Sequence, residues 1–566
     1  MEVIIKSCEE DKGIAAESFS KEEESELHQF ATNSDSNVFA WKIGDLLTAE
    51  QAGALLSRYS RTSLTGRRLF LKEFLPNRER GREFFESWLV DYGDDSIQEM
   101  AGGIPVSCEF VSNLAVKDIE DSRLASYIEK SSRYVPFDKR LPGGRYMYYK
   151  GMDISESRFS DKYEDLMDGL FDSYSSGMKK MIPYIEESNR LEDQVFRVQD
   201  ATLRITEMDS AKEERYGISE EDLRRAYDNA VKANALDFMR DYLPMATLTH
   251  VGISANARSY DNLVTKMLAS PLGESRWIGK RILSELGKLI PSLMKRTGGD
   301  YGQAKINFIR SSREGAEHAA AEEHLPKAVW KGAASLVDYT GKGLDRPDDA
   351  AQINLCAAIV YRFSEGMNFR EALEYAKAAG RERRDIIIGA YVGKRENRRL
   401  KPGRAFEHVE YLAEFTGRVG IYRDLQRHRI GTQERQRLTT KMGFEMRPQF
   451  EEIGISDEYK SKMALADELY REMQEDMPYH AQYVVTYGFL AKWYYRMNAR
   501  QLFHFVELRT TSGGHPDYRM MAQQLFKAVE AVHPSVTKHM GFANLEDKKL
   551  GRLDSEIRIA IKKRRK

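Results

Sequence analysis

Apolar residues recur at helical spacing from about Phe39 onward, which predicts that folded structure begins there. One predicted helix carries Leu46, Leu47, Ala52, Leu55 and Leu56, and a second carries Leu69, Phe70 and Phe74. Residues 1–38 show little periodicity and include the charged run at 21–26. We therefore expect a mobile acidic N-terminal arm that carries no chemistry.

Two further changes of pattern divide the chain. Residues 186–222 are rich in interleaved acidic and basic side chains, which predicts exposed helices. The alternating stretch Ser335-Leu336-Val337-Asp338-Tyr339 predicts a new first strand. We expect a first domain at 39–334 that contains the charged helical insertion, and a second at 335–566 that ends in a basic tail.

Composition narrows the class of protein. The 566 residues are 41% hydrophobic and 31% charged, with a net charge of -1, so no overall field favours nucleic acid. The three cysteines are far apart, which indicates a reducing compartment and predicts no disulfide scaffold or metal site. No apolar run is long enough to span a membrane. We expect a cytoplasmic protein that binds neither membrane nor nucleic acid.

The two halves of the chain repeat the same motifs in the same order. Asn-Ala-Arg occurs at 256–258 and again at 498–500. Each triplet follows a second matching segment, Ser-Arg-Leu-Ala-Ser at 122–126 and His-Arg-Ile-Gly-Thr at 428–432. This order indicates an ancient duplication with one insertion in the first half.

An arginine cluster in the second half is the strongest chemical signal. Arg427 and Arg429 flank His428, and Arg423, Arg435 and Arg437 lie nearby. Guanidinium groups pair with phosphate oxygens bidentately and stay charged, so the cluster suits a phosphate ligand. A solvated loop paired with Asp424 and Glu434 explains the same residues equally well.

The Asn-Ala-Arg helices have two interpretations. Arg500 and His504 are four residues apart and share a helix face, which suits ligand contact. Asn256 and Asn498 each stand where a helix begins, so each could serve only as an N-cap.

Taken together, the motifs resemble the flavin-dependent thymidylate synthases, in a long tandem form. Arg427-His428-Arg429-Ile430-Gly431-Thr432 resembles their Arg-His-Arg-x-x-Ser signature, and Phe406-Glu407-His408 and the helix from Asn498 to Arg509 match further motifs. In the first half, residues 123–134 keep the spacing Arg-x-x-Ser-x-x-Glu-x-Ser-x-Arg-Tyr. The resemblance implies an α+β fold of two homologous halves, each an antiparallel sheet packed on long helices.

The departures from the family pattern are complementary. The first half has Asp121 and Ser122 in place of the leading Arg-His, Asp94 in place of a flavin-contacting histidine, and Met267 in place of the late arginine. The second half keeps those arginines but has Gln482 where the first has Arg240. We expect hybrid sites built from both halves, and a homodimer that forms a pseudo-tetramer.

The resemblance implies reductive methylation of dUMP to dTMP, with FAD as cofactor and methylenetetrahydrofolate and NADPH as co-substrates. It assigns the pyrimidine contact to Arg509 and leaves Ser131 as a catalytic hydroxyl without an adjacent base. It assigns flavin contacts to Arg427, His428, Arg429, Asn498, Arg500, His504 and His408. It assigns nucleotide contacts to Glu129, Arg133, Arg240, Arg123 and Ser126.

Two other functions fit the sequence. A degenerate paralogue that binds flavin or nucleotide without turnover is the nearest rival, because each half has lost motif residues. An RNA-binding protein that uses the arginine-rich loop and the basic tail at 562–566 is the third, although no aromatic-interleaved sheet motif accompanies them. Cys8, Cys108 and Cys356 have no histidine nearby in sequence, which disfavours a cysteine-dependent synthase.

Overall fold

The computed structural model describes residues 2–6, 11–76, 99–141, 144–198, 201–323, 333–547 and 549–564. The chain forms two compact units. The first unit contains Met1–Lys327, Thr439–Phe489 and Glu556–Lys566, and the second contains Ala328–Leu438 and Leu490–Ser555. Residues 439–489 thus pack with the first half of the chain, although they belong to the second half in sequence.

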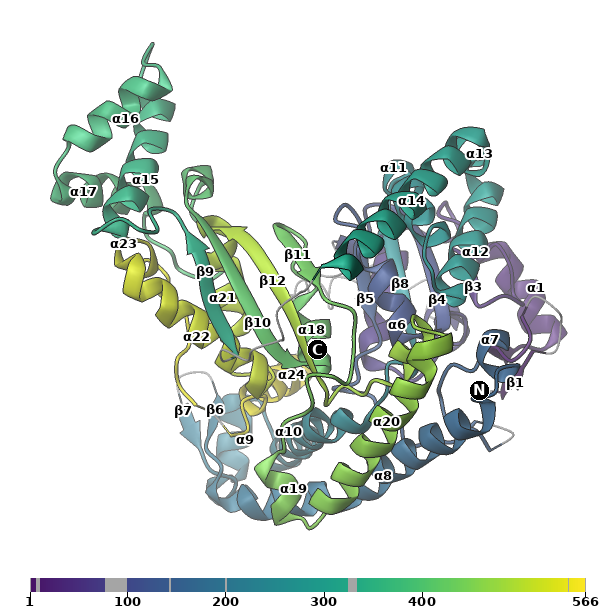
Figure 1. The fold of residues 1–566 in the computed structure, drawn as a ribbon. Helices are drawn as coiled ribbons and strands as arrows, with labels where there is room; N and C mark the ends of the chain where they lie inside the picture. Colours follow the sequence, from purple (N-terminus) through teal and green to yellow (C-terminus); the bar gives the residue numbers. More distant parts are fainter. Residues whose placement is uncertain are drawn as a thin grey trace. The chain divides into compact units, whose positions relative to one another are not determined.

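The first unit is built on a four-stranded antiparallel sheet with helices on both faces (Figure 1). Its order is β3-β4-β8-β5, and the strands are β3 (Val38–Ala40), β4 (Ile104–Ser112), β8 (Leu248–Ala255) and β5 (Ser126–Glu129). One face packs on α6 (Asn113–Ile119), α11 (Ala257–Leu268) and α12 (Gly273–Leu289). The other packs on α1 (Lys21–Phe30), α2 (Ala49–Arg58) and α3 (Gly66–Leu69). Burial on both faces explains why these strands are apolar almost throughout.

The second unit repeats this sheet in the order β9-β10-β12-β11. The strands are β9 (Ala334–Tyr339), β10 (Glu410–Arg418), β12 (Leu490–Asn498) and β11 (Thr432–Arg435). Alternate residues such as Phe415, Trp493 and Tyr495 pack on α15 (Pro347–Phe363), α21 (Ala499–Arg509) and α22 (Pro516–Val532). The opposite face exposes Tyr494 and Arg496, so these strands alternate between apolar and polar residues. The strand predicted at 335–339 is confirmed as β9.

Strand register shows that the halves are true repeats. Ile253 pairs with Val106 on one side and Tyr127 on the other, and Tyr495 pairs in the same way with Ala413 and Gln433. Short helices α6 and α18 (Val419–Leu425) follow the equivalent strands. The predicted fold class, two homologous antiparallel sheets packed on long helices, is confirmed.

The two sheets have backbone irregularities at different places, and that of the second lies between β10 and β9, at Leu412 and Ala413. The register of β4 against β8 shifts between Glu109 and Val111, whereas β10 pairs with β12 without a shift. Phe110, the extra residue, has a φ of 53°, the one positive value at a non-glycine among the residues that the structure describes. This β-bulge is confined to the first half.

The predicted N-terminal mobile arm is wrong for its described residues. β1 (Glu2–Ile5) pairs with β2 (Ala15–Ser18), and α1 begins with a capping box of Ser20 and Glu23. Leu27 and Phe30 are fully buried. Two apolar anchors and a strong cap thus order a segment whose overall composition suggested disorder.

The charged insertion is only partly helical. The long helix α8 (Ser160–Ser188) leads to a hairpin of β6 (Phe196–Val198) and β7 (Ala201–Leu203), then to α9 (Ser210–Tyr216) and α10 (Glu220–Met239). The prediction of helices throughout 186–222 is therefore wrong at the hairpin. Phe196 and Val198 are buried on either side of exposed Arg197, so local alternation outweighs the surrounding charge.

The remaining elements extend these two units. They are η1 (Tyr59–Arg61), η2 (Phe70–Phe74), η5 (Leu191–Asp193), η6 (Ile205–Glu207), η7 (Arg240–Tyr242), η8 (Arg404–His408), η9 (His480–Val484), α7 (Met152–Ser155), α13 (Pro291–Gly298), α14 (Asp300–Glu322), α16 (Phe369–Ala378), α17 (Arg381–Val392), α19 (Pro448–Glu452), α20 (Ser456–Asp476), α23 (Pro534–Thr537) and α24 (Leu553–Arg564). Within the described ranges, we find no helix that combines the length and apolarity needed to cross a membrane.

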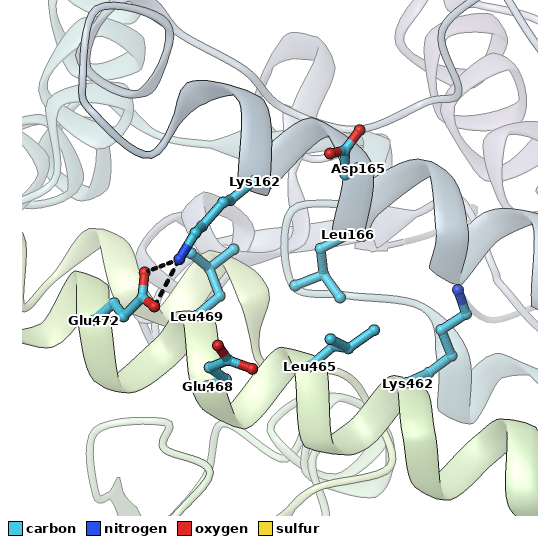
Figure 2. Close-up of a pocket in the computed structure, with 8 residues that line it drawn as sticks. All are labelled: Lys162, Asp165, Leu166, Lys462, Leu465, Glu468, Leu469 and Glu472. Atoms are coloured by element: carbon cyan, nitrogen blue, oxygen red, sulfur yellow. Dashed lines mark hydrogen bonds and ion pairs between the residues drawn. The ribbon is translucent and has the colours of Figure 1, made fainter.

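Helix α20, from the second half, packs beside α8, from the first (Figure 1). The Lys162 ammonium bonds the Glu472 carboxylate at 2.7 Å, and the Tyr184 hydroxyl donates to Glu452 at the other end. A groove of about 230 Å³ runs between the helices, with Leu166, Leu465 and Leu469 along it (Figure 2). The two halves are therefore in direct contact inside the first unit.

Candidate functional site

The arginine-rich loop of the second half lies between α18 and β11. His428 is only 5% exposed, whereas Arg427 is exposed and Arg429 half-buried. Gly431 has a φ of 118°, and a Cβ there would lie 2.5 Å from the Tyr495 ring and 2.7 Å from the Arg496 carbonyl oxygen. Glycine therefore lets the loop lie directly on β12. The equivalent residue of the first half is Ala125.

His428 joins this loop to the late helix α21. The Nε–H of Arg509 donates to Nε2 of His428 at 2.6 Å, and the Gln501 amide lies 3.4 Å from Nδ1. Because arginine can only donate, Nε2 must accept, and the imidazole is neutral with its proton on Nδ1, so the Gln501 amide nitrogen, itself a donor, does not hydrogen-bond that atom. The structure thus brings together His428 and Arg509, which were predicted from separate motifs.

The surroundings of His428 are strongly positive. Burial and the charges of Arg509, His504 and Lys401 hold the pKa of His428 well below its usual range. Burial, followed by Lys401, Arg509 and Arg398, lowers the pKa of His504 to about 4. Both rings are therefore neutral at neutral pH, and the local field favours an anionic ligand.

Other predicted flavin residues have structural partners. Asn498 caps α21 by accepting from the backbone N–H of Gln501 at 2.9 Å, so the N-cap interpretation holds; Asn256 caps α11 in the same way through Ser259. Arg500 donates to the Pro402 carbonyl oxygen at 3.0 Å and to the Glu407 carboxylate at 3.2 Å. His408 is exposed, and its ring stacks on Phe369.

In the first half, the predicted nucleotide residues lie on and after β5. Ser126 is half-buried, Glu129 is buried, and Arg123 is exposed just before the strand. Lys130, which follows Glu129, is also buried, and its ammonium donates to the Ser63 carbonyl oxygen. Burial lowers the pKa of Lys130 to about 7, although Glu109 and Glu17 oppose the shift.

Arg133 is held by a bidentate ion pair. Its Nε and Nη2 donate to the two carboxylate oxygens of Asp237, at 2.6 and 2.8 Å. The Ser131 hydroxyl accepts from the Arg133 backbone N–H, so it helps shape the turn after β5. Arg240 begins η7, three residues after Asp237, and is only 1% exposed.

Register defines which residues of the halves are equivalent. Because Ser126 and Thr432 both start the fourth strand, Asp121 and Ser122 correspond to Arg427 and His428. On the Asn-capped helices, Met267 corresponds to Arg509. The residue at 94 lies outside the described part of the chain, so its comparison with the family histidine stays a prediction.

Several residues around these positions were not predicted. Lys401, Gln501 and Asp237 each act on a predicted site residue. Asp237 had no local signal, because its partner Arg133 is 104 residues away in sequence. Lys401 and Gln501 come close to His428 only through the tertiary fold.

The remaining candidates for chemistry are the two described cysteines, Cys108 and Cys356, and any cluster of metal-binding side chains. Cys108 and Cys356 are buried, and burial raises the pKa of both thiols, which disfavours the thiolate. No group of three or more His, Cys, Asp or Glu side chains with metal-binding geometry occurs in the described ranges.

The sequence profile of one known family matches both repeats. The family is described as "Thymidylate synthase complementing protein", and its profile matches residues 45–292 and 335–535. The chain therefore belongs to this family of flavin-dependent thymidylate synthase-like proteins, in a tandem-duplicated form. The predicted resemblance is confirmed.

Similar proteins share almost the full length of the chain. A UPF0159 protein of Chlamydia muridarum is 34% identical over 95% of this chain and 98% of its own. A UPF0159 protein of Chlamydia pneumoniae is 32% identical, over 96% and 98%. A UPF0159 protein of Thermoplasma acidophilum is 31% identical, over 90% and 98%.

Proposed function

We propose that this protein is an FAD-dependent thymidylate synthase that converts dUMP to dTMP. Methylenetetrahydrofolate would supply the carbon as a methylene group. Two electrons and a proton from NADPH, with one further proton, reduce it to a methyl group, so the other products are tetrahydrofolate and NADP+. A domain division at 39–334 and 335–566 and a homodimer with pseudo-tetrameric symmetry belong to the same proposal.

The observation that carries the proposal is complementary loss at equivalent positions. The register of β5 and β11 aligns Asp121-Ser122 with Arg427-His428, so the missing residues of one half are present in the other. The reverse holds for Gln482 and Arg240. If one repeat had lost its function, the motif residues missing from the other repeat would not be expected to persist in it.

The residues of the second unit fit FAD. A dinucleotide carries a pyrophosphate, and the positive field that lowers the pKa of His504 would favour such an anion. Arg427, Arg429 and Arg500 would pair with it, while His428, His504, Asn498 and His408 would border the ring system. When bound, the flavin supplies hydride transfer.

In the first unit, Arg133 and Arg240 would neutralise the nucleotide phosphate, and the Ser131 hydroxyl would contact it as well. Glu129, Ser126 and Arg123 would contact the base and sugar. Asp237 would orient the Arg133 guanidinium, because a bidentate pair fixes its plane.

Arg509 is the candidate for the developing charge on the uracil carbonyl. Neutral His428 accepts the Arg509 Nε–H and Tyr518 is a further hydrogen-bond partner, so the remaining N–H groups would contact the substrate. Burial and a neighbouring positive charge at Arg427 lower the pKa of Arg509, although Tyr518 and Asp424 oppose this. Arg509 therefore benefits from pairing with an anion.

The purified protein tests the proposal. Its visible spectrum should show flavin, and NADPH oxidation in the presence of methylenetetrahydrofolate should require dUMP and yield dTMP. Protein that takes up no FAD on reconstitution would contradict the proposal. Flavin uptake without dTMP formation would favour the non-synthase paralogue.

A further inference from the structure

A buried ion pair in the first unit joins the two halves next to Arg240. Arg447 precedes α19 in the second half, and Asp241 follows Arg240 in the first. The Arg447 Nε donates to Asp241 Oδ2 at 2.5 Å, and Nη2 donates to Oδ1 at 3.2 Å. Arg447 is 4% and Asp241 1% exposed, so the pair is shielded from solvent.

The backbone segment that follows Asp241 pairs with the equivalent segment of the second half in a symmetric way. The Met245 N–H donates to Val485 O, and the Tyr487 N–H donates to Leu243 O. Pro244 and Thr486, which are equivalent in the two halves, form an isolated antiparallel β-bridge. A local two-fold axis therefore passes between residues 241–246 and 483–488, which we call the seam.

At one pair of equivalent positions, a side chain from each half contacts a residue of the other half. Asp241 contacts Arg447 of the second half, and its equivalent, Tyr483, donates to Glu274 of the first half at 2.7 Å. Arg240 precedes the first contact and Gln482 precedes the second. Only the Arg447 contact is adjacent to an arginine that could bind phosphate.

We propose that Arg447 is a positioning residue for nucleotide binding: through Asp241, it fixes the direction in which Arg240 presents its guanidinium. The inference rests on the proposed function, because it assumes that Arg240 binds the nucleotide phosphate. Arg240 caps the C-terminus of α10, where its backbone N–H donates to Leu236 O, and begins the short turn η7. The buried pair fixes Asp241 directly after this helix end, so it sets how the turn presents the Arg240 side chain.

The test compares the affinities for dUMP and deoxyuridine by calorimetry. Their ratio isolates the contribution of the phosphate, which a general loss of stability would not change selectively. R447M should lower this ratio about tenfold, because a misdirected arginine loses much of its electrostatic contact. R447K keeps the charge without the bidentate geometry and should lower it about threefold.

Tyr483→Phe is the matched control. It removes the contact with Glu274 at the other end of the seam, where Gln482 replaces the arginine, so the ratio should stay within about twofold of the unaltered protein. An unchanged ratio in folded R447K would overturn the inference, even if R447M does not fold. An equal fall in Tyr483→Phe would also overturn it. Unaltered protein that binds no dUMP would contradict the proposed function itself.

Discussion

The Nε–H of Arg509 donates to Nε2 of His428 across 2.6 Å, although the two residues are 81 positions apart in sequence. This bond fixes the tautomer of the imidazole and joins the arginine-rich loop to α21. It also explains why the two motifs are retained together in the second half. The bond gives the second unit a defined cationic centre.

Replacing Arg509 by methionine should lower kcat at least about a hundredfold, because a preorganised charge is lost where negative charge develops. The pKa of His428 should rise at the same time, since one of the charges that depress it is removed. Steady-state kinetics and NMR of ¹³C-labelled histidine would measure the two effects. R509K, which keeps the charge, serves as control; an R509M enzyme with unchanged kcat would exclude the assigned role.

Replacing Gly431 by alanine should lower flavin affinity, because the new Cβ pushes the loop away from Tyr495 and the Arg496 carbonyl. Fluorescence titration with FAD would measure the loss. Gly443 is the matched control: it also has a positive φ, 71°, but a Cβ there meets no atom within 4 Å. If G431A and G443A bind FAD equally well, the loop does not form the flavin site.

The N-cap residues of α11 and α21, Asn256 and Asn498, should contribute equally to stability. N498A and N256A should each destabilise the protein by about 1 kcal/mol, because each removes the side-chain oxygen that accepts from the first turn of its helix. Aspartate caps as well as asparagine, so N498D and N256D should retain the melting temperature. Loss of FAD binding in folded N498D alone would show that Asn498 contacts the ligand as well.

The buried Lys130 ammonium should lower the free energy of unfolding at neutral pH. Its pKa falls from 10.5 to about 7 on folding, so between those values the unfolded chain holds more protons and stability rises with pH. K130M should therefore raise the melting temperature, most of all below pH 7. Thermal unfolding from pH 6 to pH 10 would test this.

Lys117 provides the control for that experiment. It is equally buried but pairs with Glu120 at 2.8 Å, so K117M should lower the melting temperature by leaving a buried carboxylate unpaired. A destabilised K130M would show that the Lys130 ammonium is needed where it lies.

Sequence predicted most of the local features of the fold. Alternation located β9 at Ser335–Tyr339, and helical spacing located α2 around Leu55, because one buried face leaves a regular pattern. It failed where a few residues outweigh composition, as with Leu27 and Phe30 in the N-terminal segment.

The candidate site was predictable only as separate motifs. The order of motifs identified Arg427-His428-Arg429 and Arg509, but not that His428 accepts from Arg509. The Arg133–Asp237 and Arg447–Asp241 pairs span 104 and 206 residues. Such pairs depend on tertiary packing, which leaves no local pattern in the sequence.

The central claim is that residues of the first half bind dUMP and residues of the second half bind FAD, as the proposed function requires. The most direct measurement is a titration of FAD-loaded protein with dUMP, followed by flavin absorbance, with binding measured in parallel by calorimetry. We predict that dUMP shifts the flavin spectrum, and that R133M keeps the flavin but loses the shift. Binding of dUMP with no change in the flavin spectrum would contradict the account.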